Sequence, residues 1–106
     1  MAWLALLVAG LLEIVWAYSM KLSHGFTRLT PSIITLVAMV ASFVLLAHAM
    51  RVLPLGTAYT IWTGIGAVGA FLVGILVLNE PANFLRVLAA AMIVGGLILM
   101  KVSTPG

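Results

Sequence analysis

The sequence predicts an all-α membrane protein with four transmembrane helices per subunit, and three observations lead to this prediction. Of the 106 residues, 65% are hydrophobic and 7% are charged. The mean hydropathy is +1.34, which is too apolar for a water-soluble domain of this size. Four long apolar stretches are separated by short segments rich in turn-forming residues. We therefore expect one transmembrane domain over residues 1–106, with no soluble domain to house an enzyme.

The first span is expected at about residues 2–21, where Lys21 can reach the lipid headgroups. The N-terminus has no basic segment, and the apolar run that follows is long for a signal peptide. We therefore interpret this span as retained rather than cleaved. Gly25 then marks a turn.

The second span is expected at about residues 31–50, because Thr30 and Pro31 have the pattern of an N-cap followed by a proline at the first helical position. After a short break, the third span is expected at about residues 57–78. Turn-forming residues close it, and the fourth span follows at about residues 84–101. The connections are short enough to leave almost no protein outside the membrane.

The basic residues are nearly balanced between the two sides of the membrane. Lys21, Arg28 and Arg86 lie on one side, whereas Arg51, Lys101 and the terminal amine lie on the other. Orientation follows the excess of Lys and Arg in the loops. The near balance therefore makes dual insertion and an antiparallel homodimer possible. The alternative is a weak bias that the insertion machinery still reads in one direction.

The composition also excludes several classes of site. The chain has no cysteine, and His24 and His48 are its only imidazoles, so we expect no metal site and no cofactor. The formal net charge is +3, but the basic residues are scattered at span ends rather than gathered in a stripe. We therefore expect a lipid bilayer as the surroundings and no nucleic-acid partner.

Glu13 lies in the middle of the first span, where an ionisable group is costly and usually functional. Its helical face includes Gly10 one turn before it and Trp16 one turn after it, which leaves room beside the carboxylate. Every Lys and Arg lies near a span end, so a buried ion pair is the weaker interpretation. Hydrocarbon surroundings favour the protonated form, so that a proton and a cationic substrate would compete for Glu13. Such competition is sufficient for the exchange of protons and substrate across the membrane.

The third span carries aromatic residues close to this depth. Tyr59, Trp62 and Gly66 share one helical face. Aromatic rings can hold an organic cation, and a tyrosine hydroxyl can bond a carboxylate. The alternative is an aromatic belt at the membrane interface, which suits Tyr59 better than Trp62. Gly66, Ala70 and Gly74 recur at four-residue intervals, a small-residue spacing that favours helix packing, and Gly64 and Gly69 add freedom for a kink.

Two further spans contribute candidate residues. Ser42 is the only polar group deep in the second span; it either bonds its own backbone or faces Glu13. The fourth span has no deep polar group, and its small residues suit a helix–helix contact between subunits. These small residues are Ala91, Gly95 and Gly96.

Four helices with one acid can hardly surround a polar cavity and still keep a lipid-facing exterior. A dimer that brings two copies of Glu13 into one cavity is more plausible, and its two carboxylates would titrate as a coupled pair.

Several motifs together resemble the small multidrug resistance transporters over nearly the whole chain. The motifs are Gly-Leu-Leu-Glu13-Ile-Val-Trp16-Ala, the loop His24-Gly-Phe, and Leu-Pro-Leu-Gly-Thr-Ala-Tyr59-Thr-Ile-Trp62-Thr-Gly-Ile-Gly. The sequences around Trp16 and Trp62 are similar to the guanidinium-exporter branch of that family.

The resemblance implies an antiparallel homodimer in the bacterial inner membrane that exports a small cation in exchange for protons. It implies that Glu13 of both subunits binds substrate or protons and that the fourth span forms the dimer contact. It further implies a lining made by Gly10, Trp16, Ser42, Tyr59 and Trp62.

Tyr18, Ser19 and His48 depart from the pattern expected of that branch and have no assigned role. Export of alkyl quaternary ammonium ions therefore stays open as an alternative, with Met39 and Met50 as plastic apolar residues of the second span. A channel would need a continuous polar lining, and a rotary proteolipid subunit is generally a simple hairpin. A structural membrane subunit, in which Glu13 only holds a partner helix, is the remaining alternative.

Overall fold

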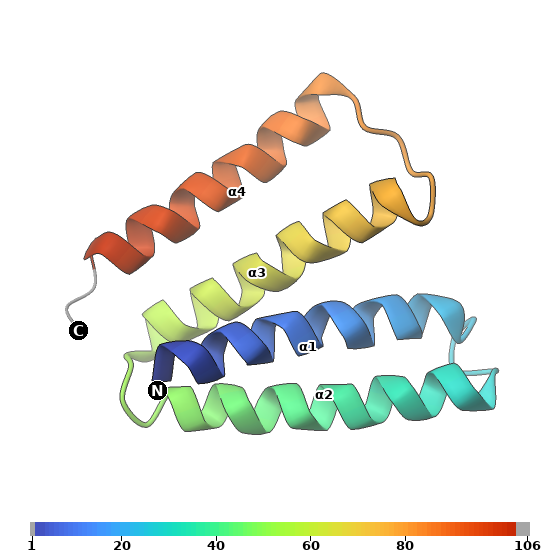
Figure 1. Cartoon of the computed structure of the whole chain (residues 1–106), viewed down its shortest axis with the longest axis horizontal. Coiled ribbons are helices and arrows are strands. Elements are labelled where there is room, and N and C mark those ends of the chain that lie inside the picture. Colours follow the sequence, from blue (N-terminus) through green and yellow to red (C-terminus); the bar gives the residue numbers. More distant parts are fainter. Residues whose placement is uncertain (1, 104–106) are drawn as a thin grey trace.

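The computed structural model describes residues 2–103, and these residues form four helices. The helices are α1 (Ala2–Leu22), α2 (Leu29–Ala49), α3 (Leu55–Leu76) and α4 (Phe84–Ser103) (Figure 1). Each is long and apolar enough to cross a membrane, because about 20 residues at a rise of about 1.5 Å span the hydrocarbon core. The predicted four-span architecture is confirmed, while residues 1 and 104–106 of the expected domain lie outside the described residues.

The start of α2 differs from the prediction. The helix begins at Leu29, and Arg28 takes the N-cap position with extended backbone angles (φ −103°, ψ 127°). The prediction that Thr30 is the N-cap is therefore wrong, and Pro31 is the third helical residue. A proline is tolerated there because the amides of the first turn have no intrahelical acceptor to lose. The turn at Gly25 is confirmed by its φ of +75°, a conformation that favours glycine.

The bounds of α3 lie two residues earlier than expected at both ends. Pro54 takes extended angles (φ −60°, ψ 151°) as the N-cap, and the helix begins directly after it. At the other end, Asn79 adopts a left-handed conformation with φ +57°. The turn lets the amide of Glu80 donate to the carbonyl of Gly74 at 2.9 Å. This bond gives a partner to one of the last carbonyls of α3, which have no donor within the helix.

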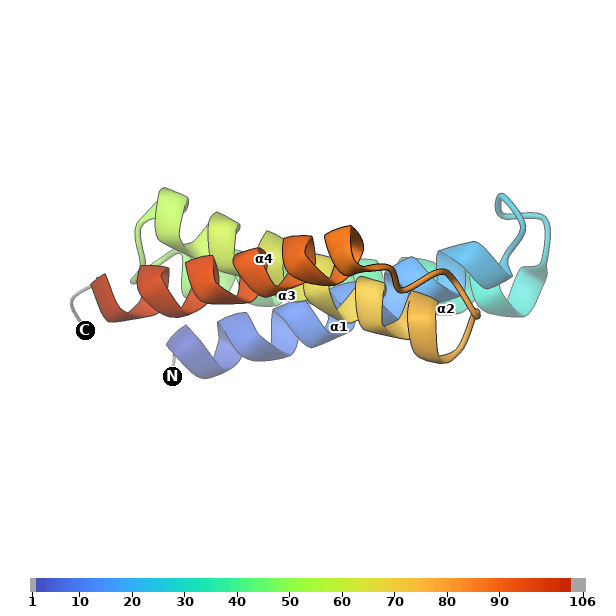
Figure 2. The same ribbon diagram turned by 90° about the horizontal axis from the view of Figure 1, so that it is seen from above.

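The helices form a thin layer rather than a closed bundle. In Figure 1, α1 lies between α2 and α3, and α4 lies on the side of α3 that is away from α1. Among the described residues, α4 has close backbone contacts only with α3. The layer measures 42 × 35 × 16 Å, and Figure 2 shows it from above. Its buried core joins α1, α2 and α3 through Leu6, Ala9, Leu46, Ala49, Leu53, Ala58, Ile61 and Trp62.

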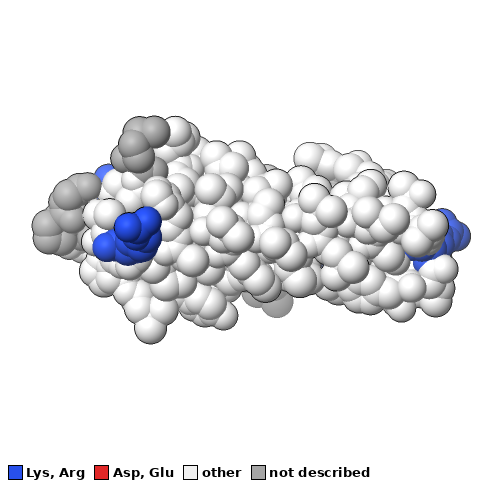
Figure 3. Space-filling model, turned by 90° about the horizontal axis from the view of Figure 1, so that it is seen from below, with Lys and Arg blue, Asp and Glu red and all other residues white. Residues whose placement is uncertain are grey.

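The surface is apolar along the length of the helices. Figure 3 shows one face, on which Lys and Arg lie only near the two ends of the molecule. None of the described residues of α4 is buried within this chain. An apolar surface bounded by basic ends matches the hydrocarbon core and headgroups of a bilayer.

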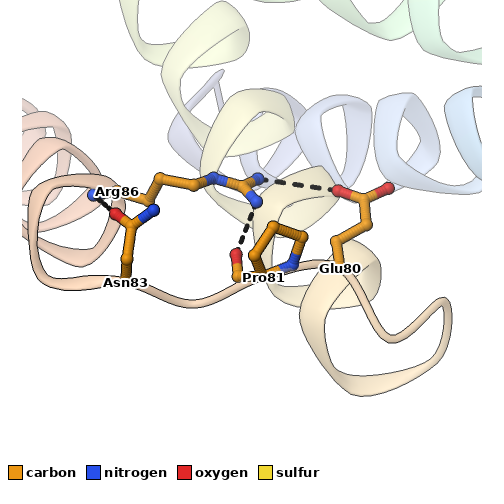
Figure 4. A network of polar contacts seen from close by, with 4 residues as sticks. All are labelled: Glu80, Pro81, Asn83 and Arg86. Carbon is orange, nitrogen blue, oxygen red and sulfur yellow. Dashed lines mark hydrogen bonds and ion pairs between the residues drawn. The ribbon is translucent and has the colours of Figure 1, made fainter.

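The connection between α3 and α4 is held by Arg86 (Figure 4). Its guanidinium lies 3.6 Å from Glu80 Oε1 and donates to the carbonyl of Pro81. The same group stacks 5.2 Å from the ring centroid of Phe71 on α3. Its backbone amide donates to Asn83 Oδ1 at 3.0 Å, which caps α4. Glu80 is therefore partly exposed but paired.

Candidate functional site

Glu13 lies against the bare backbone of Gly66. It is on the side of α1 that faces α3, and a Cβ atom added to Gly66 would overlap its carboxyl group. The carboxyl atom Oε1 is buried and has no hydrogen-bond partner within the described residues. A side chain on α3 would exclude the carboxyl from this position. Gly66 is therefore the residue that gives Glu13 its place between the helices.

Trp16 has a second unpaired polar atom one helical turn beyond Glu13. Its indole Nε1 is buried, and Trp16 Nε1 and Glu13 Oε1 are the two buried side-chain polar atoms without a partner in residues 2–103. Buried polar groups are nearly always hydrogen-bonded, and each exception calls for an explanation. An acceptor and a donor on neighbouring turns of one face have the hydrogen-bonding capacity of a binding site.

Ser42 links the three packed helices. Its hydroxyl donates to the carbonyl of Ala9 on α1 at 2.7 Å, and it accepts a bond from Trp62 Nε1 on α3 at 2.9 Å. The side chain is fully buried. Ser42 therefore bonds across helices rather than to its own backbone. Ala9 is four residues before Glu13, so its carbonyl is also the helical acceptor for the amide of Glu13.

An aromatic cluster extends from this link. The ring of Trp62 contacts Phe43 with centroids 5.8 Å apart and Tyr59 with centroids 5.6 Å apart. Trp62 is only 7% exposed, whereas Tyr59 is 52% exposed. Because the Nε1 of Trp62 is already bonded to Ser42, Trp62 offers its ring rather than its N–H to a ligand. Tyr59 keeps an open face.

Phe43 was not identified from the sequence. Its position next to Ser42 was the available signal, but adjacent residues on a helix point in different directions. The ring contact with Trp62 becomes visible only when α2 and α3 are placed together.

The remaining glycines have different neighbours. A Cβ atom on Gly10 would lie 2.6 Å from Ile65 Cγ2, one on Gly64 would overlap Leu97, and one on Gly69 would overlap Ile14. Gly10 thus meets a side chain of α3 rather than the carboxyl of Glu13.

The small residues of α4 have open surroundings in this chain. An added Cβ atom on Gly95 or Gly96 would meet nothing within 4 Å, and Ala91 is exposed. His48 is also exposed, whereas Ser19 is buried and Tyr18 is half-buried.

A groove of about 500 Å³ between α3 and α4 is lined by Tyr59, Thr63 and Gly96 among others, but not by Glu13. The acid instead lies at the seam between α1 and α3 of a layer that is 16 Å thick. A layer that is about one and a half helix diameters thick cannot surround a ligand on all sides.

Comparisons with known proteins agree with this architecture. The family described as Small Multidrug Resistance protein matches residues 1–102. A guanidinium exporter of Citrobacter freundii is 60% identical over 104 residues, which are 98% of this chain and 99% of that protein. Guanidinium exporters of Yersinia pestis and Escherichia coli strain K12 are each 58% identical over 98% of this chain. The matched regions are 100% and 99% of those proteins, respectively. The chain therefore belongs to the small multidrug resistance family of membrane transporters and is a multi-pass protein of the bacterial inner membrane.

Proposed function

We propose that this protein exports guanidinium or a similar small guanidinyl cation in exchange for protons, with both ligands competing for Glu13. The buried, unpartnered carboxyl oxygen within a membrane span carries this proposal. Relatives at 60% and 58% identity that are named guanidinium exporters support the choice of cation.

The chemistry of guanidinium suits the residues around Glu13. The ion is planar, keeps its charge, and presents N–H donors in a fork that matches a carboxylate. It also stacks on aromatic faces, which the rings of Trp16, Trp62 and Tyr59 can supply. A proton on Glu13 removes the negative charge that holds the cation. One carboxyl therefore carries either a proton or a substrate on each crossing.

A second copy of the chain would complete the site. The subunit is a thin layer with Glu13 at a seam, so an antiparallel partner laid on it would bring a second Glu13 to the same cavity. The open face of α4, with Ala91, Gly95 and Gly96, is our proposed dimer contact, because small residues let membrane helices approach closely. Gly95→Cys is expected to form a cross-link between two copies in membranes, while Leu29→Cys, exposed at the start of α2, should not.

Counterflow in vesicles tests the transport mechanism. Purified protein is reconstituted with a pH gradient, and guanidinium uptake and proton release are measured together. Glu13→Gln should abolish both, because the amide can neither release a proton nor hold the cation by charge. Glu80→Gln is the matched control, since Glu80 lies in the loop between α3 and α4. Coupled exchange that survives in Glu13→Gln would contradict the proposal.

Export of quaternary ammonium ions is the second candidate, and the exposure of Phe43 favours it. This side chain is 47% exposed although its ring contacts buried Trp62. An alkyl tail could lie along it while the charged head binds Glu13. A short-tailed quaternary ammonium in the same vesicles separates the two substrates. Exchange with that ion and not with guanidinium would favour the second candidate.

A further inference from the structure

Three contacts interlock α1 with α3 around Glu13. Ile65 of α3 fits against Gly10, Glu13 fits against Gly66, and Ile14 fits against Gly69. The partners rise in number together along both helices, so α1 and α3 run in the same direction. Each helix therefore contributes side chains that pack against glycines of the other helix.

The Ile14 side chain lies directly against the backbone of Gly69. A Cβ atom on Gly69 would overlap both Cδ1 and Cγ1 of Ile14 and would lie 3.4 Å from its Cβ. Only a residue without a side chain permits this approach. Substitution of Gly69 by alanine must therefore displace the tip of Ile14 or separate the helices, whereas alanine at both positions leaves an ordinary contact.

Ile14 follows Glu13 directly in α1, so the two side chains move with one rigid segment of helix. The other side of this segment is tied to α2 by the bond from Ser42 to the carbonyl of Ala9. With α1 held there, a push at Gly69 that rotation of the Ile14 tip does not absorb tilts or rotates the turn that carries Glu13. The carboxyl would then leave its place against Gly66.

We propose that Ile14 and Gly69 are positioning residues that set where the Glu13 carboxyl lies between the helices. Neither residue touches the substrate. Their contact fixes the separation of α1 and α3 at the turn that carries the acid. The inference rests on the proposed role of Glu13 as the cation and proton site.

The test is a set of three variants: Gly69→Ala, Ile14→Ala and the double variant. Guanidinium binding is followed by intrinsic tryptophan fluorescence over a range of pH. Dimer content and thermal unfolding are recorded on the same samples. Gly56→Ala is the matched control, because Gly56 is also on α3 and an added Cβ there meets nothing within 4 Å.

A displacement of about 1 Å at a binding or reacting group can reduce function about 100-fold. We expect Gly69→Ala to weaken guanidinium binding about tenfold or more and to move the pH midpoint of binding by about half a unit or more. The double variant should recover most of the affinity and return the midpoint toward that of the parent protein. Gly56→Ala should change neither value.

Two results would overturn the inference. In the first, Gly69→Ala lowers the unfolding temperature but leaves the pH midpoint unchanged, as a purely structural role requires. In the second, the double variant binds no better than Gly69→Ala. Failure of the proposed function has a different signature: Glu13→Gln would keep pH-dependent binding whatever happens at Gly69.

Discussion

Replacement of Ser42 by alanine is expected to lower both stability and guanidinium binding. The change removes the bond to the carbonyl of Ala9 at 2.7 Å and leaves the buried Nε1 of Trp62 without its acceptor at 2.9 Å. These two losses are unequal. The carbonyl of Ala9 retains its helical donor, whereas the indole N–H of Trp62 has no other partner among the described residues.

The loss of the acceptor for Trp62 determines most of the expected change in the free energy of unfolding. A buried donor left unsatisfied costs about 1–3 kcal/mol, whereas an interhelical bond in a membrane contributes about 0.6 kcal/mol on average. We therefore expect Ser42→Ala to lower the free energy of unfolding by about 2 kcal/mol, most of it from Trp62. Because Trp62 also contacts Tyr59 and Phe43, release of its ring should weaken guanidinium binding as well.

Unfolding in a denaturing detergent, followed by tryptophan fluorescence, measures the change. Ser32→Ala is the matched control: Ser32 is half-buried on the same helix, and its hydroxyl donates locally to the carbonyl of the N-cap residue Arg28 rather than to another helix. A double-mutant cycle with Trp62→Phe isolates the pair, since phenylalanine has no N–H to leave unsatisfied. If Ser42→Ala is as mild as Ser32→Ala, or costs the same in both backgrounds, this reasoning is refuted.

Three further outcomes follow from the contacts described above. Gly66→Ala should abolish guanidinium binding because its Cβ would overlap the carboxyl of Glu13, while Gly56→Ala should bind normally; equal binding by the two variants would contradict the placement. Guanidinium affinity should fall as the pH falls, by up to about tenfold per pH unit where Glu13 takes up a proton, and a pH-independent affinity would exclude competition. Lys101 Nζ lies 4.4 Å from the ring centroid of Trp3, so Lys101→Gln should lower the free energy of unfolding by about 0.5–1 kcal/mol and leave transport intact; a larger loss would show that Lys101 does more.

The helices were predictable because hydrocarbon requires long apolar segments with internally bonded backbones. Their ends were less predictable. Thr30 is a residue type that is common at the N-cap. However, α2 begins at Leu29, and Arg28 takes the N-cap position with extended backbone angles. α3 ends at Leu76, and a left-handed turn at Asn79 follows it. The residue types near a helix end allow several alternative end residues that are close in free energy.

The candidate site was predictable in its residue types and less so in its geometry. A lone acid in an apolar span is conspicuous, and aromatic residues at similar depth are few. Helical periodicity shows which residues share a face, but not which neighbour that face meets. Gly10 lies on the face of Glu13 and was expected to give clearance, whereas the residue against the carboxyl is Gly66 on α3.

The sequence by itself determined four membrane-spanning helices, a buried acid without a cation at its depth, and the family to which the chain belongs. These follow from the cost of polar groups in hydrocarbon and from motifs along the chain. Only the tertiary structure decided that Ser42 ties α1 to α3, that Trp62 uses its N–H within the protein, and that Glu13 and Ile14 rest on glycines of α3. Such contacts depend on the rotation and register of one helix against another, which are set by the packing of all their side chains together.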